Sequence, residues 1–224
     1  RNNPRAHITL VVKPEVYNLV ELCPYVNVVL SFSRKSGRFS FYHNLWRALL
    51  FSYCYLKKEH YDLAIVPRFD ADAGYGGGML AFLSEAKRRV GYSEYVLPHK
   101  MISDKGYDGF YTDVLLPETM VVSHEVERNL HILRHIGVAV IDDSLEIWLD
   151  DTDKARAQAM LPSLEGSEIK IALSIASGSP RREWPIENFI ELIKELLPKK
   201  RICWAIVGAG KRAVDSAHQI EKEC

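Results

Sequence analysis

Short apolar runs alternate with amphipathic stretches along this chain of 224 residues. The apolar runs are rich in β-branched side chains, which is typical of strands buried inside a sheet. In the stretches between them, apolar residues return every three or four positions, as on a helix with one buried face. The predicted strands cover residues 7–12, 26–30, 61–66, 87–91, 169–175 and 202–207. The predicted helices cover residues 14–22, 41–60, 79–83, 123–136, 152–161, 186–196 and 211–221.

The order of these elements predicts an α/β fold, because strands that follow one another through a helix pair in parallel. An acidic stretch at residues 142–162 separates the first four strands from the last two, and we place the domain change there. The predicted domains are residues 1–150 and 151–224. We expect both to be incomplete, since no strand precedes His7 and the second domain is too short for a whole doubly wound sheet.

Charged side chains follow the strand at residues 61–66, namely Arg68, Asp70 and Asp72. In open parallel sheets the ligand crevice lies outside the carboxyl ends of the strands, so these three residues are site candidates by position. The glycine-rich run at residues 74–78 comes several residues later and lacks the G-x-G-x-x-G phosphate pattern. The glycine-rich run is explained at least as well by the start of a helix or by a linker as by a phosphate-binding loop.

Residues 92–119 show little periodicity, and we expect a long surface segment there. The next helix should begin after Ser123 as its N-cap and end at Gly137. His131 and His135 lie four positions apart on this helix, but we expect no metal there because the pair lacks further ligands.

The most informative stretch begins with the strand at residues 169–175. A turn of small and hydroxyl residues follows at residues 177–180, then Arg181 and Arg182, and then a helix from Ile186. A strand, a polar turn and a helix N-terminus favour an anion, because backbone N–H groups point outward and arginine adds paired hydrogen bonds. A solvated loop with its arginines in water is the alternative interpretation.

The composition of the chain argues against several classes of protein. The chain is 47% hydrophobic and 26% charged, as ordinary globular proteins are. Its 29 Lys and Arg balance 29 Asp and Glu, so we expect no nucleic-acid partner, although residues 1–110 hold 15 basic against 10 acidic side chains. The four cysteines are far apart and should be reduced thiols. We see neither a signal peptide nor a membrane-spanning run, so we expect a cytoplasmic protein. Because the first residue is Arg, we expect either a piece of a longer chain or a chain given without its disordered ends.

Residues 171–193 carry a pattern that points to a family. A strand leads to a Gly/Ser turn, a basic residue, Arg182, stands two positions before Trp184, and a helix with Phe189 follows Pro185. This pattern resembles the donor-domain signature of family 9 glycosyltransferases, the bacterial lipopolysaccharide heptosyltransferases. Further stretches resemble that family in the same order, at residues 8–12, 61–66, 83–92, 124–133 and 206–210.

The resemblance implies a GT-B architecture, in which two Rossmann-like domains face each other across a cleft. The N-terminal domain would take the acceptor, a glycolipid of the lipopolysaccharide core and lipid A. The C-terminal domain would take a nucleotide sugar such as ADP-heptose. Transfer of heptose or a related sugar would proceed with inversion, without a metal or other cofactor, and with peripheral contact to the inner membrane from the cytoplasm.

The resemblance also assigns donor-side residues. Ser177 matches the hydroxyl residue that hydrogen-bonds the donor diphosphate. Arg182 matches the lysine that neutralises it, and arginine keeps the charge of lysine but not its shape. The same donor side includes Gly178, Ser179 and Gly208.

The catalytic base stays unassigned. The family's proposed catalytic aspartate would lie in a Gly-Asp loop before Arg1, and its second donor motif would lie beyond Cys224. Within the chain, Asp70 and Asp72 are base candidates and Arg68 is the acceptor-side candidate. Two rival hypotheses remain, a GT-B transferase for another nucleotide sugar and a degenerate, non-catalytic domain that binds a glycan or a protein. A nicotinamide-dependent oxidoreductase is disfavoured, because no G-x-G-x-x-G follows a strand.

Overall fold

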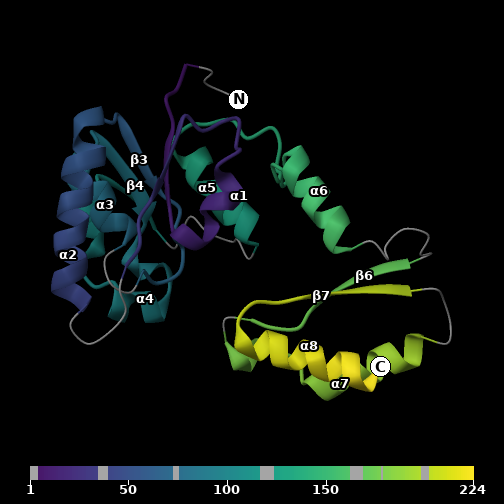
Figure 1. The fold of residues 1–224 in the computed structure, drawn as a ribbon. Helices are drawn as coiled ribbons and strands as arrows, with labels where there is room; N and C mark the ends of the chain where they lie inside the picture. Colours follow the sequence, from purple (N-terminus) through teal and green to yellow (C-terminus); the bar gives the residue numbers. More distant parts are fainter. Residues whose placement is uncertain are drawn as a thin grey trace. The chain divides into compact units, whose positions relative to one another are not determined.

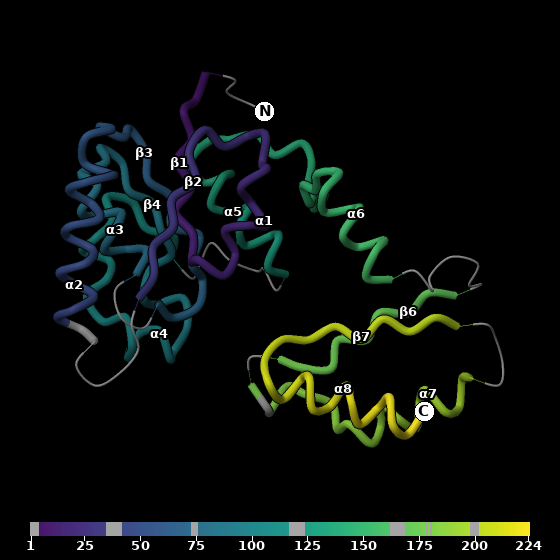
Figure 2. The backbone as a smooth tube through the Cα atoms, viewed as in Figure 1, coloured from purple at the N-terminus to yellow at the C-terminus, as the bar shows by residue number. Residues whose placement is uncertain are grey.

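The computed structural model describes residues 5–34, 40–72, 76–116, 124–161, 169–177, 179–197 and 202–224 (Figures 1 and 2). The chain forms two compact units, Arg1–Trp148 and Leu149–Cys224, and we describe each by itself. All strand pairs of the described residues are parallel, which confirms the predicted α/β class.

The N-terminal unit contains two parallel sheets. β1 (Thr9–Val12) pairs with β2 (Val28–Ser31). β3 (Leu63–Val66), β4 (Arg88–Tyr92) and β5 (Asp113–Leu115) form the second sheet in that order. Sequence patterning predicted the first four of these strands, whereas β5 lies in the segment expected to have no regular structure.

Helices connect these strands. The predicted helix at residues 41–60 is α2 (Ser40–Phe51), continued by a π-helical turn at Ser52–Leu56 and a 3-10 turn at Lys57–Glu59. His60 ends it with a positive φ of 48°. The α-helices of this unit are α1 (Tyr17–Val20), α2 (Ser40–Phe51), α3 (Gly77–Leu83), α4 (Pro98–Ser103) and α5 (Glu125–His135).

Two apolar clusters hold the N-terminal unit together. One joins the end of β2 to α2, its continuation and α3, and the other joins the three-stranded sheet to α5. The buried residues of the first cluster are Phe32, Ala48, Leu56, Met79 and Leu80. Those of the second are Phe69, Val90, Tyr92, Leu115 and Ile132.

The segment after β4 folds inward, which corrects the prediction of a long surface segment at residues 92–119. Ser93, Lys100 and Asp104 are at most 3% exposed, and α4 and β5 lie in this segment. Many of its buried groups are polar, so hydrophobic periodicity could not reveal them.

Carboxylates hold this segment in place by accepting hydrogen bonds from backbone and hydroxyl groups. Asp108 accepts from Ser93 Oγ and from the Glu94 N–H, both at 2.7 Å. The Glu94 carboxylate in turn accepts from the Gly106 N–H at 2.6 Å. Buried polar groups are tolerated when each finds such a partner.

The ends of α5 follow helix-capping chemistry. His124 is the N-cap, and its Nδ1 accepts a hydrogen bond from the Val126 N–H at 3.3 Å. The predicted N-cap, Ser123, lies outside the described residues. Gly137 follows the helix with a φ of 89°, a conformation that favours glycine at this position.

The C-terminal unit contains one parallel pair of strands, β6 (Ile169–Ser174) and β7 (Ile202–Val207). α6 (Asp151–Met160) precedes the pair, and α7 (Ile186–Leu196) and α8 (Lys211–Glu223) follow the two strands.

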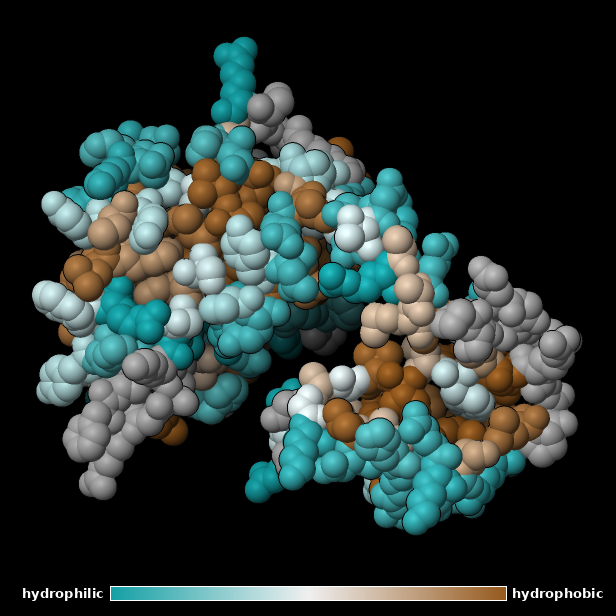
Figure 3. All heavy atoms as spheres, in the orientation of Figure 1, coloured by the Kyte–Doolittle hydropathy of each residue, from teal (hydrophilic) through white to brown (hydrophobic). Residues whose placement is uncertain are grey.

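Only one face of this sheet is covered by helices among the described residues. Leu173, Ile175 and Trp204 pack with apolar residues of α7 and α8. On the other face, Ala172 and Val207 are exposed. Figure 3 shows hydrophobic residues gathered on the sheet side of this unit and hydrophilic residues on its helices.

Candidate functional site

The loop after β6 is organised around Ser177. The Ser177 N–H donates to Glu183 Oε1 at 3.0 Å, and its hydroxyl donates to the Ser179 carbonyl at 2.6 Å. The Ser179 N–H donates back to Ser177 Oγ at 3.1 Å, and the Arg182 N–H donates to the Ser179 carbonyl at 3.0 Å. These bonds form a tight turn that ends in a short 3-10 helix at Pro180–Arg182. Gly178, predicted in this turn, lies outside the described residues.

Glu183 links this loop to the start of α8. One of its carboxylate oxygens accepts the Ser177 N–H, and the other accepts from Arg212 Nη1 at 2.9 Å. Arg212 is not among the site residues predicted from the sequence. A signal was present, since Lys211 and Arg212 follow a glycine turn at the end of a buried strand, as Arg181 and Arg182 do.

Gly208 permits a close approach between β7 and α8. A Cβ at this position would lie 2.7 Å from the Ala213 Cβ, so a larger residue would push the helix away. Gly210 then takes a φ of 85° as the N-cap of α8, with no side-chain cap. The first N–H groups of this helix therefore have no side-chain acceptor at the cap.

Basic side chains border the β6 loop and the start of α8. Arg181 and Arg182 are exposed, as are Lys211 and Arg212, and the carboxylate among them is that of Glu183. Backbone N–H groups, a serine hydroxyl and guanidinium groups together suit a multiply charged anion such as a diphosphate. Ser177, Ser179 and Gly208 lie where the strands end, on the side expected for a ligand.

Trp184 contacts the core rather than the loop's polar groups. Its ring meets Phe189 edge-on, with 4.8 Å between centroids and an angle of 81° between planes. Half of its surface stays exposed. Its packing therefore anchors the start of α7 to the unit.

In the N-terminal unit, Arg68 and Asp70 lie at the surface after β3. Arg68 Nη2 donates to the Ala71 carbonyl at 3.1 Å. The Asp70 carboxylate lies 3.9 Å from His99 Nε2, and both side chains are well exposed. Both residues are therefore accessible to a ligand.

Asp72 is enclosed instead. Its carboxylate accepts the Gly77 N–H at 2.7 Å and pairs with the Arg34 guanidinium at 3.5 Å. Its own N–H donates to the Asp104 carboxylate at 2.8 Å, and Asp104 pairs with Lys100 at 3.3 Å. These contacts tie the loop after β2, the loop after β3 and α4 to one another.

Tyr111 lies near the carboxylates of Asp72 and Asp104. Burial raises the pKa of its phenol, and the charges of Asp72, Asp104 and Asp108 raise it further. The ring occupies the space above Gly91, where a Cβ would meet it at 2.5 Å. The phenol therefore stays neutral at physiological pH and fills the gap that this glycine leaves.

The opposite end of the sheet carries a charged triad, Arg88, Asp113 and His135. Arg88 donates to Asp113 Oδ2, and His135 Nε2 lies 2.8 Å from Asp113 Oδ1. Burial raises the pKa of Asp113, but the hydrogen bonds from Arg88 and His135 outweigh it, and the pKa lies below its usual value. Among the described residues, no cluster of His, Cys, Asp or Glu could hold a metal ion.

Solved structures match over nearly the whole chain. A family 9 glycosyltransferase from Veillonella parvula matches with a TM-score of 0.69 and 18% identity, over 98% of this chain and 58% of its own. E. coli ADP-heptose LPS heptosyltransferase II matches with a TM-score of 0.65 and 15% identity, over 99% and 61%. E. coli heptosyltransferase WaaC, solved with ADP, matches with a TM-score of 0.62 and 16% identity, over 98% and 62%.

This chain has the fold of the family 9 glycosyltransferases. The fold predicted from the resemblance, the GT-B architecture, is thereby confirmed. The chain spans 58 to 62% of the length of these three structures. No family model and no curated relative matches its sequence. None of the described helices is long and apolar enough to cross a membrane.

Proposed function

We propose that this chain belongs to a glycosyltransferase that takes a nucleotide diphosphate sugar at the β6 loop of its C-terminal unit. The observation that carries the proposal is the turn built on Ser177 and Glu183, flanked by exposed guanidinium groups, in a fold shared with transferases solved with ADP. The donor of choice is ADP-heptose or a related sugar nucleotide.

The chemistry fits the residues present. Displacement at the anomeric carbon releases a diphosphate, and its negative charge grows in the transition state. Arg182 and Arg212 would neutralise that charge, and the Ser177 hydroxyl would turn from the Ser179 carbonyl to hydrogen-bond a phosphate oxygen. The sugar would transfer with inversion.

The acceptor hydroxyl must lose its proton to a base. Of the two aspartates named above, Asp70 is exposed and available, whereas Asp72 is committed to Arg34 and Gly77. We therefore keep Asp70 as the base candidate within this chain and Arg68 as a contact for an acidic acceptor.

The acceptor we propose is a lipopolysaccharide core glycolipid, reached from the cytoplasm by a protein that touches the inner membrane. Support comes from the match to E. coli LPS heptosyltransferase II.

A calorimetric donor screen tests the proposal. ADP-heptose, UDP-sugars and GDP-sugars are titrated into the protein under the same conditions. We expect saturable binding of the ADP sugar and much weaker binding of the others. Preference for a UDP or GDP sugar would reassign the donor, and the absence of binding by any of them would contradict a transferase.

A further inference from the structure

Lys100 is a buried lysine to which the proposed function gives no role. It lies on α4, is 3% exposed, and donates from its Nζ to the Arg68 carbonyl at 3.3 Å and to the Asp70 carbonyl at 3.4 Å. The Asp104 carboxylate, one helical turn later, pairs with the same ammonium at 3.3 Å. One buried cation therefore holds two backbone carbonyls of the loop after β3.

Further contacts fix the other residues of this loop. Phe69 is 8% exposed, and its ring meets Tyr92 of β4 edge-on with 5.3 Å between centroids. The Arg128 guanidinium of α5 lies 4.3 Å from the centroid of the Phe69 ring. The Asp72 N–H donates to the Asp104 carboxylate at 2.8 Å. The loop is therefore held by α4, β4 and α5 at once.

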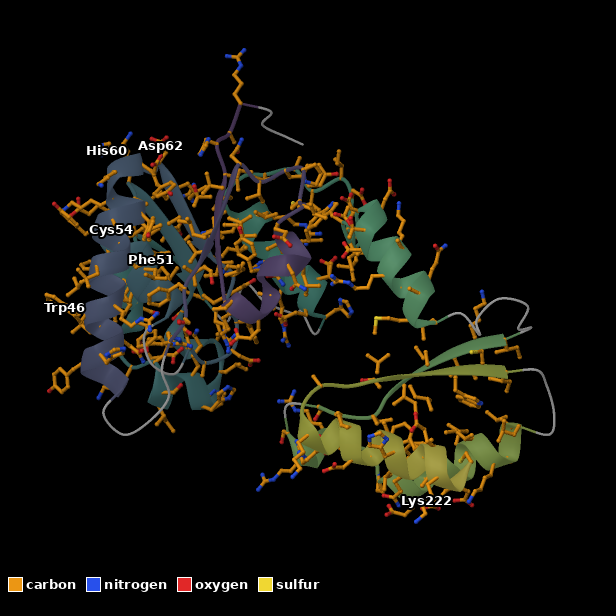
Figure 4. The ribbon with its side chains drawn as sticks, viewed as in Figure 1. Trp46, Phe51, Cys54, His60, Asp62 and Lys222 are labelled. Carbon is orange, nitrogen blue, oxygen red and sulfur yellow. The ribbon has the colours of Figure 1, made fainter. Side chains whose placement is uncertain are left out.

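Three side chains beside this buried anchor remain in solvent. Arg68 and Asp70 are exposed, and Nε2 of the exposed His99 on α4 lies 3.9 Å from the Asp70 carboxylate. In Figure 4, Asp62, which directly precedes β3, lies at the end of the N-terminal unit opposite α4, which Figure 1 labels. The strand therefore runs toward α4, and the three exposed side chains lie beyond its carboxyl end, where parallel sheets bind ligands.

Stability alone does not explain the buried ion pair of Lys100 and Asp104. Burial removes so much hydration from two charges that apolar residues of similar volume are often as stable or more stable. The pair does, however, fix backbone atoms of a loop, and a fixed loop holds its exposed side chains in the geometry that a ligand requires. Such an arrangement is expected where those side chains contact a substrate.

We propose that Lys100 is a positioning residue for the acceptor side of the transferase. By holding the carbonyls of Arg68 and Asp70, its ammonium fixes the directions in which these two side chains leave the loop, and it keeps His99 beside Asp70. Arg68 then meets an acidic group of the acceptor, and Asp70 meets its reacting hydroxyl. The inference rests on the proposed function, which places both side chains at the acceptor.

Removing the buried pair without leaving a buried charge tests this role. Lys100→Met with Asp104→Asn takes away both charges and the donors to the loop, whereas the amide oxygen introduced at position 104 can still accept the Asp72 N–H. The matched control, Arg88→Met with Asp113→Asn, removes an ion pair at the opposite end of the same sheet. Urea unfolding measures the stability of both variants, and every assay is run under conditions in which both are folded.

Sugar transfer from ADP-heptose to heptose-free lipopolysaccharide gives the kinetic readout. For the Lys100/Asp104 variant, kcat/KM for the acceptor should fall roughly tenfold or more, because a small displacement of groups that contact the reacting atoms has a large effect on rate. Its affinity for ADP, measured by calorimetry, should not change, since the proposed donor loop lies in the C-terminal unit. A merely structural role would leave kcat/KM unchanged in a folded variant, and the control should keep both values of the wild type.

Amide hydrogen exchange, followed by mass spectrometry, tests the hold of Lys100 on the loop without any substrate. Exchange in the Lys100/Asp104 variant should become faster at the loop after β3 and stay unchanged in the three-stranded sheet. The control variant should show the exchange of the wild type at this loop.

Three results would overturn the role of Lys100. They are an unchanged kcat/KM for the acceptor in the Lys100/Asp104 variant, an equal loss in the control variant, and an unchanged exchange rate at the loop. A wild-type protein that transfers no sugar would instead contradict the proposed function, and the exchange measurement would still decide whether Lys100 holds the loop.

Discussion

The loops after β6 and after β3 both carry charged residues at the carboxyl end of a strand. The arginine side chains are exposed in the first loop, and a carboxylate is buried in the second. After β6, backbone and hydroxyl groups satisfy one another, and Arg181 and Arg182 stay exposed. After β3, the carboxylate of Asp72 is buried between Arg34 and the Gly77 N–H, and its backbone N–H donates to Asp104, which is buried at the end of α4. A charged group at a strand end is therefore available to a ligand only where other groups of the protein do not already hold it.

The largest expected effect comes from the enclosed charges. Asp104→Ala should destabilise the protein by about 3–5 kcal/mol, because it leaves the buried ammonium of Lys100 with carbonyl oxygens but no carboxylate to balance its charge. Urea unfolding followed by circular dichroism measures the loss.

A double replacement sharpens this prediction. Lys100→Met with Asp104→Leu removes both buried charges and should recover much of the lost stability. A single Asp104→Ala variant as stable as the wild type would show that the two charges are not enclosed as described.

In the β6 loop, Glu183→Ala should cost about 1–2 kcal/mol, because the Ser177 N–H and the Arg212 guanidinium each lose an acceptor. Glu183→Gln should cost less, since its amide oxygen can still accept the Ser177 N–H. Thermal unfolding of both variants gives the comparison. Equal losses would argue against the backbone contact as the source of the effect.

Asp113 at the opposite end of the sheet gives an intermediate case. Its pKa is lowered in the folded state, so its contribution is present above the unfolded pKa near 3.8 and is lost as the pH falls through the folded value. Asp113→Asn should cost about 1 kcal/mol at pH 7, and the difference from the wild type should vanish in stronger acid. Unfolding curves at several pH values test this, and a pH-independent difference would contradict it.

The smallest effect should come from an exposed pair. Asp62 and Lys87 lie 2.7 Å apart with both side chains in solvent. Asp62→Asn should leave the thermal midpoint unchanged within error, because water screens the pair. If Asp62→Asn lowered stability as much as Asp104→Ala, the proposed difference between buried and exposed charges would be wrong.

The β6 loop and its flanking elements could be predicted from the sequence because the information is local. A β-branched run, a turn of small residues and the helical spacing from Ile186 follow one another along the chain. The partners of Asp72 and Glu183 could not be predicted in the same way. Arg212 is 29 residues from Glu183 and Asp104 is 32 residues from Asp72, so only the fold brings them together.

The segment after β4 escaped prediction for a different reason. Its buried residues include Ser93, Glu94, Lys100 and Asp104. A prediction from hydrophobic periodicity places such polar residues at the surface. Their burial depends on hydrogen-bond and ionic partners that only the folded structure supplies.

In the proposed transferase, the β6 loop holds the diphosphate of a nucleotide sugar. The direct test compares ADP with AMP by calorimetry in the wild type, in Arg182→Ala and in Arg156→Ala, a matched control on the exposed surface of α6. The wild type and the control should bind ADP more tightly than AMP. Arg182→Ala should lose about 1–3 kcal/mol of that preference, as one charged hydrogen bond supplies. Equal preferences in all three proteins would contradict the claim.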